Sequence, residues 1–219
     1  MSAREAARLA VLGTDGVAES WRRASPAGRR AIEDWHRIAS GFVGDLVCWN
    51  MTGRYLQRLG LVSTEHNGVA LAFGGGIGGE AVRLSEQGNE VWYCDLPGTS
   101  VWKFAEWRSR RHGYGWRFVT EVPDRPALFD CITSFNVFGS LTADGLVETL
   151  ERMAIALKPG GRLYCAHDWR ERPEHPYIHD HTVFWDETIG RLPLTTTFDC
   201  RSPGASDKAY LSILTRDSS

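Results

Sequence analysis

The spacing of apolar and polar residues predicts helices in the first part of the chain and an alternation of strands and helices after it. Ser25-Pro26 provides an N-cap followed by a proline at the first helical position, and apolar residues then recur at helical spacing. A second amphipathic helix is predicted from about Phe42 to Leu59. Beyond it, the predicted elements are, in order, a strand from Val69, a helix, a strand ending at Asp95, a helix over 99–111, strands over 116–120 and 129–135, a helix over 142–157 and a strand over 162–168.

This alternation is typical of a parallel sheet with helices on its faces. The last part differs, because strand-like runs at 195–200 and 209–215 are separated by a Ser/Pro/Gly/Asp-rich loop and predict an antiparallel hairpin. We therefore expect an α/β, Rossmann-like, mostly parallel sheet that ends in a C-terminal hairpin. Residues 1–66 are expected to form an N-terminal helical cover, and 67–219 one nucleotide-binding unit.

The stretch from Val69 to Asp95 reads as strand, glycine-rich turn, helix and strand, which is the opening of a nucleotide-binding βαβ unit. Its glycines allow tight turning and close approach of a ligand to the backbone. They are Gly74, Gly75, Gly76, Gly78 and Gly79. Asp95 follows at the spacing expected of an acid that accepts hydrogen bonds from ribose hydroxyls. The turn formally matches GxGxxG, so a nicotinamide dinucleotide remains an alternative ligand, although some sixty leading residues fit a cover over a site better.

Composition excludes several broad classes of function. The net charge of −2 and the pI of about 6.4 give no general basic field for nucleic acid or anionic lipid, which favours a small substrate. No apolar run is long enough to cross a membrane and the N-terminus is too charged for a secretory leader, so we expect a cytoplasmic protein. The five cysteines show no metal-ligand spacing and are expected to pack mainly in the core.

Four segments resemble class I S-adenosylmethionine-dependent methyltransferases, over about Val69 to Arg216. They are the glycine turn, Asp95, the segment FDCITSFNVFGSL, and ALKPGGRLYCAHD, whose LKPGG turn is the most specific. The resemblance implies S-adenosylmethionine as cofactor and a seven-stranded sheet. It also implies cofactor contacts for a set of nine residues, with Asp95 at the ribose, Leu96 at the adenine, and Phe135 and Asn136 beside the sulfonium. The set is Phe73, Gly74, Gly75, Gly76, Gly78, Asp95, Leu96, Phe135 and Asn136.

One position departs from the family pattern. The family commonly has an acidic residue two positions before the first glycine, where this chain has Ala72. The amino group of the cofactor therefore needs another partner, and Glu80 or a residue of the N-terminal helices is the candidate.

The segment after the fifth predicted strand carries the candidate catalytic groups. Ligands of α/β sheets bind beyond the carboxyl ends of strands, so His167 and Asp168 are predicted to act as a base or to contact the substrate. Each is also compatible with a purely structural role. The histidines that follow, at 175, 179 and 181, lack a common zinc spacing, and no metal is expected.

Methyl transfer to a small molecule, with secondary metabolism as one setting, is the expected function. A second enzymatic interpretation is a cyclase similar to azetidine-2-carboxylate synthases, which release methylthioadenosine from the cofactor; Asn136, Tyr177 and the missing acid at Ala72 keep it open. An NAD-dependent oxidoreductase, a nucleic-acid-modifying enzyme using the basic tract from Lys103 to His112, and a noncatalytic cofactor-binding module are further alternatives. Neither nucleic acid nor membrane is an expected partner, and a homodimer is a possible assembly.

Overall fold

The computed structural model describes most of the chain from the second predicted helix onward. The described residues are 34–37, 39, 42–169, 178–201 and 209–218. The predicted helix start at Ser25-Pro26 and the candidates Tyr177 and His175 lie outside them.

Seven strands form one mixed sheet in the order β3-β2-β1-β4-β5-β7-β6. Strands β1 to β5 are parallel, and β7 runs antiparallel to both β5 and β6. The bounds are β1 Val69–Phe73, β2 Glu90–Cys94, β3 Arg117–Val119, β4 Phe129–Phe135, β5 Leu157–Asp168, β6 Leu194–Arg201 and β7 Ala209–Arg216. This confirms the predicted fold class, including the terminal hairpin.

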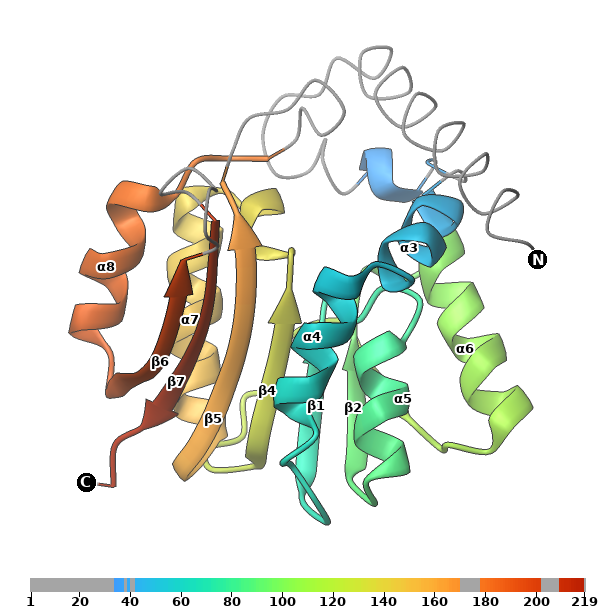
Figure 1. Cartoon of the computed structure of the whole chain (residues 1–219), viewed down its shortest axis with the longest axis horizontal. Helices are drawn as coiled ribbons and strands as arrows, with labels where there is room; N and C mark the ends of the chain where they lie inside the picture. Colours follow the sequence, from blue (N-terminus) through green and yellow to red (C-terminus); the bar gives the residue numbers. More distant parts are fainter. Residues whose placement is uncertain (1–33, 38, 40–41, 170–177, 202–208, 219) are drawn as a thin grey trace.

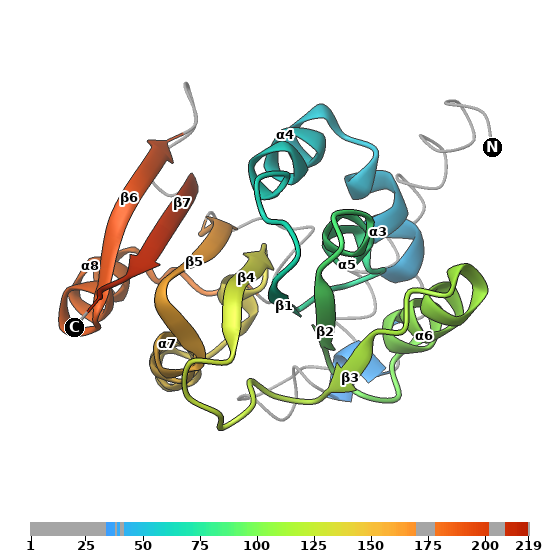
Figure 2. The same ribbon diagram turned by 90° about the horizontal axis from the view of Figure 1, so that it is seen from below.

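Helices cover both faces of the sheet (Figures 1 and 2). Side chains of α4, α5 and α6 form one buried cluster with β1 and β2, while α7 and α8 form a second cluster with β4 and β5 on the other face. The bounds are α3 Phe42–Asn50, α4 Gly53–Val62, α5 Gly79–Glu86, α6 Ser100–His112, the short 3-10 helix η1 Phe138–Ser140, α7 Ala143–Ala156 and α8 Thr182–Arg191. No helix within the described ranges is long and apolar enough to cross a membrane.

The single helix predicted over about 42–59 is wrong, because the chain breaks at Met51 and Thr52 and restarts as α4. The Thr52 side chain caps the new helix by accepting a hydrogen bond of 3.2 Å from the Tyr55 N–H. The restart changes the helical phase, so Tyr55 is buried and Leu56 is exposed.

Helix α8 was not predicted. Its buried residues, Trp185, Thr188 and Ile189, give only one turn of apolar spacing, which is too short a pattern to distinguish from a loop in the sequence. Strand β5 also starts earlier than predicted, because Leu157 pairs with Phe129 before a register shift.

Candidate active site

A cavity of about 550 Å³ lies at the carboxyl ends of the central strands and is lined on one side by residues of α3. The last residues of several strands line its floor, among them Phe73, Cys94, Phe135 and His167. Parallel sheets bind ligands at this edge because the loops that follow neighbouring strands converge there. The volume lies in the range of small-molecule sites.

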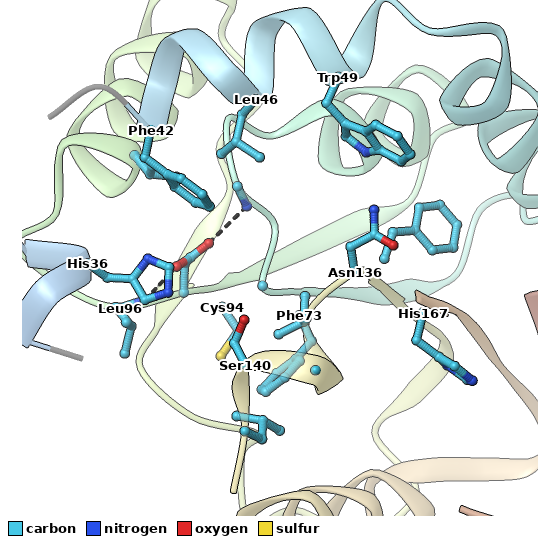
Figure 3. A pocket seen from close by; sticks show the side chains of 18 of the residues that line it. His36, Phe42, Leu46, Trp49, Phe73, Cys94, Leu96, Asn136, Ser140 and His167 are labelled. Carbon is cyan, nitrogen blue, oxygen red and sulfur yellow. Dashed lines mark hydrogen bonds between the residues drawn. The ribbon is translucent and has the colours of Figure 1, made fainter. Parts of the chain in front are cut away.

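Helix α3 covers the cavity. Phe42, Leu46 and Trp49 follow one another at helical spacing on α3, and Figure 3 shows their side chains over the cavity, together with His36. Burial lowers the pKa of His36 to about 4. The cover is therefore mainly apolar and aromatic.

Two of the loop glycines face the cavity. Gly74 and Gly76 line it, and both have a positive φ, +60° and +55°. A Cβ on Gly76 would point into the space under Leu46, whose Cδ1 would be 3.4 Å away. At Gly74 the nearest obstacle is Val137, at 2.2 Å. Gly76 is thus the glycine whose missing side chain leaves room for a ligand.

Two other glycines of the predicted cofactor set face the core instead. A Cβ on Gly75 would lie 2.6 Å from the Tyr93 ring, and one on Gly78 would lie 2.6 Å from the Trp116 ring. Neither residue lines the cavity. The structure assigns both a packing role, because aromatic side chains press against the loop from below.

Asp95 holds the glycine loop in place. Its Oδ2 accepts a hydrogen bond of 2.9 Å from the Gly76 N–H, and its Oδ1 accepts one of 2.7 Å from the Leu96 N–H. Burial raises the pKa of the Asp95 carboxyl, and these two backbone donors oppose the rise. The carboxylate lines the cavity and keeps acceptor capacity for ligand hydroxyls.

Tyr93 supports the same loop from the core side. Its hydroxyl donates a hydrogen bond of 2.6 Å to the Gly76 carbonyl, so both polar groups of Gly76 are fixed. The sequence carried no sign of this contact, because Tyr93 occupies an ordinary buried strand position.

Beyond Asp95 the cavity continues into a part of mixed lining, the Leu96 slot. Leu96, which is predicted to contact the adenine, lines this slot. The other lining residues are the apolar Val101 and Val122 and the polar Thr99, Thr120 and Glu121.

Asn136 lies on the opposite side of the glycine loop, directly after β4. Its φ is +60°, which is uncommon for a residue other than glycine, and its N–H donates a hydrogen bond of 2.6 Å to the Ala166 carbonyl. Asparagine is among the few residues that tolerate this conformation. Asn136 and Phe135 both line the cavity, as predicted.

Arg58 is a cavity residue that the sequence analysis missed. It lies on the buried face of α4, one turn after Tyr55, and is 7% exposed. Its Nη1 donates a hydrogen bond of 3.1 Å to Oδ1 of Asn136. The detectable sign was an arginine at a helical position whose neighbours are apolar.

His167 and Asp168 both line the cavity at the end of β5. The His167 ring is 1% exposed and stacks on Trp169 at 4.0 Å between ring centroids. Burial first, and the Arg58 charge second, lower the pKa of His167 to about 3. His167 is therefore neutral and a weak proton acceptor near pH 7.

The replacement predicted for the missing acid is not provided by Glu80. Ala72 is fully buried in β1, and Glu80 lies in the first turn of α5 outside the residues that line the cavity. Burial raises the pKa of Glu80 to about 7, against the opposing effects of Tyr55, Arg58 and Arg108. Glu80 belongs to the support beneath the site.

The basic tract from Lys103 to His112, which lies on α6, divides into two parts. Arg108 donates a hydrogen bond of 3.0 Å to the Ile77 carbonyl and so fixes the glycine turn, whereas Arg110 and Arg111 are exposed. Among the described residues, no group of three or more His, Cys, Asp or Glu side chains is arranged to hold a metal ion.

A family model described as a methyltransferase domain matches residues 71–163 of the chain. A search of curated proteins found no match. Solved structures agree in fold with this chain at low sequence identity. One is the Burkholderia thailandensis 1,6-didemethyltoxoflavin-N1-methyltransferase with bound 1,6-didemethyltoxoflavin and S-adenosylhomocysteine, at 20% identity and a TM-score of 0.64, covering 83% of this chain and 86% of that one.

A second is the mitomycin 7-O-methyltransferase MmcR, at 14% identity and a TM-score of 0.64, covering 93% of this chain and 67% of that one. A third is the CurJ carbon methyltransferase, at 15% identity and a TM-score of 0.58, covering 80% and 59%. The domain match and the sheet order together confirm the predicted recognition and favour S-adenosylmethionine over a nicotinamide cofactor.

Proposed function

We propose that this class I S-adenosylmethionine-dependent methyltransferase acts on a small molecule held in the covered cavity, in the biosynthesis of a secondary metabolite. The observation that carries the proposal is the continuity of the cavity. It runs from the slot beside Leu96, past Asp95 and Gly76, to Asn136 and Asp168 under the aromatic cover of α3. One continuous cavity thus contains the features expected for the cofactor and further room for an acceptor.

The residues present fit the cofactor. Asp95 is placed to accept from the ribose hydroxyls, Leu96 and Val122 to contact the adenine, and the Gly76 backbone to approach the methionine part. The bound cofactor supplies a methyl group on a positively charged sulfur. Aromatic rings attract such a cation, and Phe73, Phe135 and Trp49 line the cavity.

Positioning is the main task that remains for the protein. Methyl transfer is a displacement that depends on alignment, and a base is needed where the nucleophile carries a proton. We assign that role to Asp168, at the carboxyl end of β5, and assign His167 to the cavity wall. Asn136 and Phe135 lie between this end and the glycine loop.

A small acceptor is favoured over a polymer by the cover over the site. Figure 3 shows the side chains of His36, Phe42, Leu46 and Trp49 over the cavity, where they reduce the room for a polymeric acceptor. Two of the similar structures carry names of small-molecule methyltransferases, with a nitrogen and an oxygen acceptor. Their acceptors differ, so they favour a substrate class and no particular atom.

Calorimetry with S-adenosylhomocysteine tests the cofactor site directly. We expect one site per chain, together with a rise in melting temperature on adding the ligand, because a ligand that binds only the folded state stabilises it. An absence of binding at saturating ligand would overturn the proposal. A panel of small heterocyclic and phenolic acceptors then tests methyl transfer through the appearance of S-adenosylhomocysteine.

A second candidate function, cyclisation of the cofactor, is favoured by one observation. Ala72 is buried and provides no acid at the position where the family pattern has one, while the Arg58 cation lies at the Asn136 end of the cavity. This environment disfavours a protonated amino group. Incubation with S-adenosylmethionine alone separates the two functions: methylthioadenosine formed at enzymic rates indicates cyclisation, and S-adenosylhomocysteine formed only with an acceptor indicates methyl transfer.

A further inference from the structure

The Arg58 guanidinium is a buried cation at the edge of the cavity. The residue is 7% exposed, and its Cζ lies 5.2 Å from the centroid of the Trp49 ring and 5.9 Å from that of Phe135. Both of these rings line the cavity with it. The two aromatic side chains limit the positions that the guanidinium can take.

The described residues satisfy only part of the hydrogen-bonding capacity of the Arg58 guanidinium. A guanidinium has five N–H donors, and one hydrogen bond, to Asn136 Oδ1, is formed with the described residues. Among the ion pairs of the described residues, none includes Arg58. Burial lowers the pKa of Arg58 to about 10, with a further contribution from Arg54, and the more distant Glu80 and Asp168 oppose this. A buried charge of this kind is costly unless an anion pairs with it.

The location of Arg58 identifies the anion. Its partner Asn136 follows β4, next to β1 and the glycine loop, so the free donors lie at the end of the cavity opposite to the Leu96 slot. According to the proposed function, this end of the cavity receives the amino-acid part of the cofactor, which carries a carboxylate. An arginine fork matches a carboxylate in shape and charge.

We propose that Arg58, held by Asn136 and the rings of Trp49 and Phe135, binds the carboxylate of the cofactor's methionine part. The inference rests on the proposed function. Recognition at this end is then based on the carboxylate, in place of the acid that the family pattern puts at Ala72. Asn136 is a positioning residue in this arrangement, since it fixes one Nη group and leaves the others directed to the ligand.

The test compares two ligands that differ only in the carboxylate. They are S-adenosylhomocysteine and the 5′-thioadenosine that carries a 3-aminopropyl chain. Calorimetry of the wild type is expected to show about ten- to hundredfold weaker binding of the second ligand, the size of a hydrogen-bonded charged contact. Equal binding of the two ligands would overturn the inference while leaving the proposed function intact, and no binding of either would instead overturn the proposed function.

Substitution of Arg58 locates the effect. Arg58→Met is expected to weaken S-adenosylhomocysteine to nearly the affinity of the aminopropyl ligand and to leave the latter nearly unchanged. The quantity compared is the ratio of the two affinities, that for S-adenosylhomocysteine divided by that for the aminopropyl ligand. Arg58→Lys, which keeps the charge and loses the planar pair of donors, is expected to give a ratio between those of the wild type and Arg58→Met. If Arg58→Met folds and keeps the wild-type ratio, the inference is overturned.

Arg111→Met serves as the matched control. It removes the same charge from an exposed position on α6 that does not line the cavity. The wild-type ratio is expected in this variant, and a loss equal to that of Arg58→Met would show a general charge effect and overturn a specific role. If Arg58→Met does not fold, Asn136→Ala, which releases the guanidinium, is expected to lower the ratio; an unchanged, wild-type ratio both in Asn136→Ala and in Arg58→Lys would overturn the inference.

Discussion

The Asp95 carboxylate accepts a hydrogen bond from the Gly76 N–H at 2.9 Å, which joins the end of β2 to the turn after β1. The acid expected to bind the ribose therefore also fixes the loop that is expected to receive the methionine part of the cofactor. Since its other oxygen accepts from the Leu96 N–H, the side chain fixes both the glycine turn and the start of the segment after β2.

Asp95→Ala is expected to weaken S-adenosylhomocysteine binding by at least about a hundredfold, because ligand contacts and a loop anchor are lost together. Asp95→Asn provides a more conservative change. An amide has one acceptor oxygen, so it cannot accept from both backbone N–H groups on separate oxygens, and we expect a loss of similar direction. Calorimetry checks both variants, and unchanged affinity in both would place the cofactor elsewhere.

Gly76→Ala and Gly78→Ala are expected to have opposite consequences for binding and folding. At Gly76 the added methyl group enters the cavity, so the fold persists with a strain of about 1–2 kcal/mol while ligand affinity falls. At Gly78 the methyl group meets Trp116 at 2.6 Å, so the main effect is on unfolding. Denaturant unfolding and calorimetry on both proteins separate the two effects, and a stable Gly76→Ala protein with wild-type affinity would contradict the assignment.

His167 is expected to remain neutral through the physiological pH range, since its pKa is lowered to about 3, mainly by burial. The unfolded chain binds a proton at His167 more readily than the folded chain does, so protonation of this ring favours unfolding. Stability is therefore lost as the pH falls below the unfolded value of 6.5 toward 3. NMR titration of the ring Cε1–H, assigned with His167→Gln, checks this; an inflection near pH 6 would contradict it and restore His167 as a base.

Glu80 is expected to change stability with pH in the opposite direction to His167. Burial raises its pKa from 4.5 to about 7, so the folded chain binds the proton more tightly and stability falls as the pH rises between these values. Relative to the wild type, Glu80→Gln should gain roughly 3 kcal/mol in the free energy of unfolding across that interval. Denaturant unfolding at a series of pH values measures the gain, and a constant difference would show that Glu80 is ionised throughout.

The sequence by itself determined the strand and helix alternation, the glycine turn and the acid at Asp95. These are local features: periodicity reports which side chains are buried, and turn and cap residues such as Thr142 report where elements begin. The terminal hairpin could be predicted for the same reason. The break at Thr52 and the helix α8 were not predicted. The break depends on one capping hydrogen bond, and α8 has three buried side chains, so both leave only a weak pattern in the sequence.

The tertiary structure alone decided which loop glycines face a ligand and which face Tyr93 and Trp116, since neighbouring glycines look alike in the sequence. It also placed Arg58 beside Asn136, 78 residues later in the chain, and buried His167 among tryptophan rings. Contacts between distant residues, and the pKa shifts that burial imposes, arise only when the elements pack. They are properties of the folded arrangement, which local sequence patterns do not encode.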